Sequence, residues 1–169
     1  MHLSEEITLK INNSCRVIQL VLPFLSITCL ILLGFVFLDF SGPMVMNEQP
    51  IRGSLFLAGV AFFAATVLAP MCQRALLAKL TNEKSNLAEQ QAAAAARIMQ
   101  VSVIGACLVL MVAACINIRS FQTTKDVVHL VVTGFLLVAI LCRMPTQSTY
   151  QQKIDEFLSQ RIGTDKTSK

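Results

Sequence analysis

The chain has 169 residues, of which 54% are hydrophobic and 14% charged, and its formal net charge is +4. This composition excludes a soluble domain beside the apolar segments and leaves room for one helical bundle with short tails. Four apolar stretches predict an all-α, polytopic integral membrane protein. We expect a four-transmembrane-helix bundle, residues 17–144, with spans of about 17–38, 53–71, 98–118 and 127–142.

Residues 1–16 are predicted to form a cytoplasmic N-terminal segment. Leu3, Ile7 and Ile11 recur every four residues, which predicts a short amphipathic helix along the membrane surface, interrupted by the polar residues 12–14. The first span then begins near Arg16. Its 22 residues extend about 33 Å, which matches a hydrocarbon core of about 30 Å.

The second and third spans are predicted to form an extended central hairpin. Good helix formers from Gln73 to Leu80 continue the second helix beyond the membrane, with a kink at Pro70. A turn follows over residues 81–86, and the third helix runs over 87–118, about 48 Å. Both arms therefore project into the cytoplasm as a stalk.

The fourth span is the shortest, and its 16 residues extend only about 24 Å. We expect Arg143 at its cytoplasmic end and Pro145 to close it. Residues 145–169 are predicted to form a cytoplasmic amphipathic helix, about 148–162, and a polar tail. One face of this helix is apolar and must cover the stalk, the lipid interface or another protein, so it holds the candidate partner-binding residues Tyr150, Ile154, Phe157 and Leu158.

The distribution of basic residues predicts the orientation. If successive connections alternate sides, 11 of the 14 Lys and Arg residues lie on the side that holds both termini and the stalk. The positive-inside rule therefore places both termini in the cytoplasm. The compact chain and its short connections favour a bacterial inner membrane.

The sequence predicts no enzyme, cofactor or metal site. It has no nucleophile, phosphate-loop or zinc-ligand motif, and the six cysteines fall within spans or at their cytoplasmic ends, where packing explains them. No basic face with accessible aromatic side chains indicates nucleic-acid binding. The ionisable residues Asp39, Arg119, Asp126 and Arg143 are all expected at span ends, not at mid-membrane.

Two functions remain open. The leading hypothesis is an interaction or accessory subunit that acts through the cytoplasmic stalk and the C-terminal helix, with the lipid bilayer and a protein as its partners. The alternative is a homo-oligomeric small-solute transporter or channel, with a polar path along Gln100, Ser102, His129 and Thr133. His129 follows Asp126 by three residues, which fits a hydrogen-bonded interfacial histidine better than a pH-sensitive pair.

Overall fold

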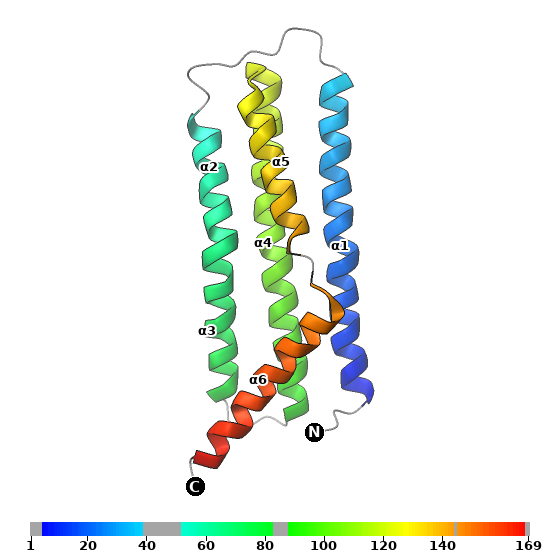
Figure 1. Cartoon of the computed structure of the whole chain (residues 1–169), viewed down its shortest axis with the longest axis vertical. Coiled ribbons are helices and arrows are strands. Elements are labelled where there is room, and N and C mark those ends of the chain that lie inside the picture. The colour runs from blue at the N-terminus through cyan, green and yellow to red at the C-terminus, as the bar shows by residue number, and fades with distance from the viewer. Residues whose placement is uncertain (1–4, 39–51, 83–87, 144, 168–169) are drawn as a thin grey trace.

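The protein is all-α in a computed structural model that describes residues 5–38, 52–82, 88–143 and 145–167. Figure 1 shows long helical columns side by side, with a shorter helix beside them and the last helix crossing the lower half diagonally. The elements in chain order are α1 (Glu5–Leu38), α2 (Arg52–Phe63), the π-helix η1 (Ala64–Leu68), α3 (Ala69–Asn82), α4 (Ala88–Thr124), α5 (Val127–Leu141) and α6 (Gln147–Thr167).

Three helical columns are long and apolar enough to cross a membrane, over Thr8–Val36, Gly53–Leu80 and Gln90–Thr124. This confirms the all-α class and three of the predicted spans at the level of length and composition. The fourth, α5, is apolar but has only 15 residues.

The centre of the bundle is α4, which packs against α1, α2, α3, α5 and α6. Its buried positions are rich in alanine, and α2 and η1 face it with the buried residues Ala58, Ala61 and Ala65. Such small side chains let helix backbones approach closely. The connections that join the long columns lie outside the described residues. Within the described residues, packing on α4 holds the other helices together.

The N-terminal segment is not a separate surface helix, and that prediction is wrong. It forms the first turns of a continuous α1, in which Ile11, Cys15, Ile18 and Leu22 form one buried stripe. The expected break does not occur because the polar side chains there find partners. The Ser14 hydroxyl donates to the Lys10 carbonyl at 3.1 Å within the helix. Leu3 lies outside the described residues.

The second helix continues past its predicted span, as expected, through α2, η1 and α3 to Asn82. The expected irregularity of the helix does not lie at Pro70 itself. The helix instead widens into the π-helix η1 directly before it, a common response where a proline interrupts the backbone ladder. The predicted turn over residues 81–86 lies largely outside the described residues.

The α4 helix runs six residues beyond the predicted end of the third span, to Thr124. Only Lys125 and Asp126 then separate it from α5. Lys125 adopts a left-handed conformation with φ of 61°, and the Asp126 carboxylate caps α5 by accepting the Val128 N–H at 3.0 Å. The α4–α5 connection is therefore a tight turn. The last helix, α6, also exceeds its predicted range and reaches Thr167.

Candidate functional site

Arg143 lies midway along the bundle, not at its end. Its guanidinium donates a hydrogen bond to the backbone carbonyl of Ala65 in η1, and it lies close to Cys107 of α4. At about 1.5 Å per residue, Cys107 is about 15 Å along α4 from Arg97 and about 18 Å from Arg119. Arg143 directly follows the C-terminal end of α5, as expected, but this end lies beside the middle of α4, because α5 begins high on the extended α4 and ends about 22 Å below.

Pro70 explains why Ala65 needs this donor. In a regular α-helix the Ala65 carbonyl would accept the N–H of Ala69, but here that N–H is given to Ala64, in the π register. The corresponding π partner of Ala65 is Pro70, which has no N–H. The Ala65 carbonyl is therefore left without a backbone donor, and the Arg143 guanidinium supplies one.

The charge of Arg143 is not neutralised within the described residues. Its side chain is half-buried, and its one side-chain hydrogen bond there is to a carbonyl rather than to a carboxylate. A guanidinium carries five donors. The site can therefore accept a further polar group, and an anionic one fits its charge best.

The α6 helix is held against the bundle by its apolar face and by polar contacts with α1 and α4. The Tyr150 hydroxyl donates to the Ala96 carbonyl at 2.6 Å. The Asn12 amide oxygen accepts hydrogen bonds at 3.1 Å from both Gln147 and Gln151. Where the chain enters α6, the Gln19 amide donates to the Pro145 carbonyl, also at 3.1 Å.

The candidate partner-binding residues of α6 are therefore not a free surface. Tyr150, Ile154 and Phe157 are 3%, 1% and 7% exposed and belong to the main hydrophobic core. The apolar face of α6 was expected to cover the stalk, the lipid interface or another protein. In the structure it packs on the stalk and on α1. The side chain of Leu158 lies outside the described part of the structure.

A groove of about 540 Å³, here called the stalk groove, separates α3 from α4 and α6. Pro70 lies in its wall, about 7 Å along the helix from Ala65. Figure 1 shows α6 crossing the lower half of the bundle diagonally toward the lower end of α3. The groove carries two cations and one carboxylate. Its lining residues are Pro70, Gln73, Arg74, Leu77, Ala78, Met99, Lys153, Glu156 and Phe157.

The residues of the predicted polar path are not brought together along one route. The Ser102 hydroxyl donates to the Ala69 carbonyl at 3.3 Å, between α4 and α3. Thr133 is fully buried in α5 and donates to the carbonyl of His129 at 2.8 Å. Gln100 is half-buried on α4, two residues before Ser102, whereas His129 lies beside Asn117, about 22 Å further along α4.

His129 belongs to a buried polar cluster near the α4–α5 turn. Its Nδ1 lies 3.1 Å from the Asn117 amide oxygen and 3.4 Å from the Ser54 hydroxyl. The Asn117 amide group is oriented by its hydrogen bond to the Ala113 carbonyl at 2.9 Å, so its oxygen can only accept and Nδ1 carries the hydrogen. The histidine pairs with Asn117 rather than with the Asp126 carboxylate. Its Nε2 is buried and has no hydrogen-bond partner among the residues that the structure describes.

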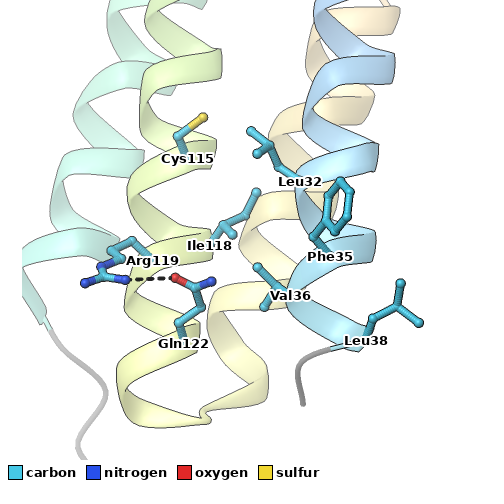
Figure 2. A pocket seen from close by; sticks show the side chains of 8 residues that line it. All are labelled: Leu32, Phe35, Val36, Leu38, Cys115, Ile118, Arg119 and Gln122. Atoms are coloured by element: carbon cyan, nitrogen blue, oxygen red, sulfur yellow. Dashed lines mark hydrogen bonds between the residues drawn. The ribbon is translucent and has the colours of Figure 1, made fainter.

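A second hollow, of about 630 Å³, lies between α1 and α4 near the same end (Figure 2). Its α1 wall is apolar, with Leu32, Phe35 and Val36. On α4, Arg119 donates to the Gln122 amide oxygen at 3.2 Å. This arginine already has a side-chain partner at the end of the bundle, which sets it apart from Arg143.

The link between Arg143 and Pro70 was not predicted from the sequence. The available signal was the shortness of the fourth span. If this helix begins at the outer end of the bundle, it ends before it has passed the whole apolar region, and Arg143 then lies within that region. The described residues contain no group of three or more His, Cys, Asp or Glu side chains that could hold a metal ion. No protein-family model, curated protein or solved structure matches this chain, so the site is interpreted from its own geometry.

Proposed function

We propose that the chain is a non-catalytic accessory subunit with four membrane helices, which binds a partner membrane protein carrying an acidic side chain at mid-membrane. Arg143 is the observation that carries this proposal. It lies at the height of Cys107, about halfway along the apolar part of α4 that Arg97 and Arg119 bound. Ionisable residues at such depth usually pair with one another or line a pathway.

The charges and the fold together support an orientation with both termini in the cytoplasm. The N-terminal end of α1 and the C-terminal end of α6 lie at the same end of the bundle as the stalk (Figure 1), where most of the basic residues fall. The positive-inside rule then places this end in the cytoplasm. The compact chain favours a bacterial inner membrane.

The stalk groove supplies the second contact with the partner. It leads from the cytoplasm to within about two turns of Arg143, and its Arg74 and Lys153 outnumber Glu156. An acidic, amphipathic segment next to a partner's membrane helix fits this charge and the apolar floor of Leu77, among others. The α6 helix thus contributes one wall of the groove rather than a free apolar face.

Site-specific photo-crosslinking in native membranes tests the proposal. Ala75 and Ala78 are both exposed on α3, but only Ala78 lines the stalk groove. A photoreactive residue at position 78 should form an adduct with one membrane protein, which mass spectrometry identifies. The same residue at position 75 is the matched control. Equal adducts at the two positions, or none at 78, would contradict a partner in this groove.

The charge is tested with the identified partner. We expect Arg143→Leu to reduce partner recovery more than tenfold, since truncation of one member of a desolvated charge pair costs several kcal/mol. Arg119→Leu, at the far end of α4, should leave recovery unchanged. Replacing the partner's mid-membrane Asp or Glu by the amide should have the same effect as Arg143→Leu. A partner without such a carboxylate refutes the pairing.

The transporter alternative has weaker support. A path would need Gln100 and Ser102 to continue to His129 and Thr133, and these residues occupy different interfaces. It remains the second candidate because the His129 Nε2 is a buried acceptor that has no partner in the described part of the chain. Solute flux into proteoliposomes that is abolished by His129→Leu would favour it.

A further inference from the structure

A second groove on α3 and α4 has a shape and a charge that differ from those of the stalk groove. This alanine groove, as we call it, encloses about 450 Å³ between residues 64–76 of η1 and α3 and residues 97–109 of α4. Its walls are mainly alanine, valine and glycine. The Ser102 hydroxyl in it is already bonded to the Ala69 carbonyl at 3.3 Å. Its one charged residue, Arg97, lies at the cytoplasmic end.

The length of the alanine groove matches one leaflet of a bilayer. From Arg97 to Val109 the α4 axis rises about 18 Å, and half of a hydrocarbon core is about 15 Å. The groove therefore runs from the level of the headgroups to the midplane. An acyl chain anchored beside Arg97 would end where the groove ends.

We propose that the alanine groove holds one acyl chain of an anionic phospholipid of the cytoplasmic leaflet, with the lipid phosphate on Arg97. The inference takes the membrane placement from the proposed function but does not depend on the protein partner. The exposed Arg97 guanidinium is suited to paired hydrogen bonds with phosphate oxygens. It also lines a neighbouring hollow between α1 and α4 that contains Lys10, so the headgroup lies in a basic environment.

The small side chains make the groove a site rather than an ordinary lipid-facing surface. Gly105 lies in the wall at mid-groove, and a Cβ added there would meet no other atom within 4 Å. The space beside it is therefore open to a ligand. An acyl chain here gains van der Waals contacts on both helices, whereas lipid around the bundle contacts one convex surface.

Native mass spectrometry of the full chain in a mild detergent tests the site. The protein is titrated with phosphatidylglycerol or with phosphatidylcholine bearing the same acyl chains. We expect one phosphatidylglycerol to bind about fivefold more tightly than phosphatidylcholine, the effect of about one basic residue on an anionic headgroup. Arg97→Gln should abolish this preference. Arg16→Gln, an exposed arginine on α1 outside the groove, should preserve it.

The acyl-chain half of the proposal is tested with two glycines. Gly105→Leu fills the groove and should remove the tightly bound lipid, whereas Gly59→Leu adds the same side chain at an exposed α2 position that is also open and should not. Equal binding of the two lipids by the wild type, or unchanged binding by Gly105→Leu, would overturn the site. Alkaline carbonate extraction of the source membranes is the companion measurement. A chain that stays in the membrane without lipid preference refutes the lipid site alone, whereas an extracted chain refutes the membrane placement beneath both proposals.

Discussion

The link between Pro70 and Arg143 predicts an energetic coupling between two residues that are 73 positions apart. Pro70→Ala restores a backbone N–H and removes the ring that disfavours a regular helix. The turn can then return to the α register, in which the Ala65 carbonyl accepts the N–H of Ala69. The carbonyl no longer needs Arg143. Removal of the guanidinium should therefore cost less stability in the Pro70→Ala background than in the wild type.

The size of the coupling follows from the hydrogen bond involved. A hydrogen bond to a charged group contributes about 1.5–3 kcal/mol in soluble proteins, and the largest measured between membrane helices is about 1.7 kcal/mol. We expect about 1.5 kcal/mol. The effect of Arg143→Leu alone has no firm sign, since it removes the donor but also removes a charge from an apolar region. Only the double-mutant cycle isolates the bond.

Equilibrium unfolding in mixed micelles, followed by circular dichroism, measures each corner of the cycle. Circular dichroism is suitable because the chain has no tryptophan. The matched control is a cycle between Arg143→Leu and Pro23→Ala, because Pro23 is the proline inside α1 and should give additive effects. A coupling below about 0.4 kcal/mol for Pro70, which is within ordinary additivity, would refute the argument. The variant with both changes also serves the partner test, since it should fold normally yet still fail to bind an acidic partner.

Three further predictions concern α6, the buried cluster and the topology. Burial raises the pKa of the Tyr150 phenol above its usual range, with a smaller contribution from a nearby thiol, so the folded state favours the neutral hydroxyl. The contribution of this hydroxyl to stability is complete below the unfolded pKa of about 10 and is lost as the pH rises above that value. Unfolding midpoints should therefore fall between pH 8 and 11 for the wild type and change less for Tyr150→Phe. Equal slopes for the two proteins would contradict the role of Tyr150. Asn117→Leu should destabilise by about 1–2 kcal/mol because it leaves the His129 ring N–H only the longer contact with the Ser54 hydroxyl. Addition of His129→Leu should recover part of the loss, and a double variant less stable than Asn117→Leu would contradict the pairing. In a cysteine-free background, a membrane-impermeant maleimide should label Thr123→Cys in intact cells but Ser159→Cys only after permeabilisation, and labelling of both from one side would refute four spans.

The apolar runs were enough to predict most helices, because a span is specified by local composition. The spans in α1, α2 and α4 are such cases. The continuation of the second helix through residues 73–80 was also predictable, since it depends on local helix propensity. The continuity of α1 was not. Asn12 is compatible with a helix there because Gln147 and Gln151, far along the chain, donate to its side chain.

The candidate site depends on the relative height of helices, which a single sequence encodes weakly. The extra six residues of α4 raise the α4–α5 turn by about 9 Å, and the short α5 then ends at mid-bundle. From the sequence, the fourth helix was expected to end level with the cytoplasmic ends of the other spans, whereas α5 ends beside the middle of α4, near Cys107. The role of Pro70 was missed for the same reason, since its effect on Ala65 matters only once Arg143 lies beside it.

The central position of α4 also has a consequence for biogenesis. Within the described residues, α1 packs on α4, α5 and α6 but makes no substantial contact with α2. In a membrane, the first two apolar helices of this sequence would therefore have no partner in each other, and each would assemble only after α4 is synthesised. Helix insertion and helix assembly are separable steps in membrane proteins. Here the delay would last until about residue 124 has been made, so the first two helices would be held together only by a helix that is synthesised after both.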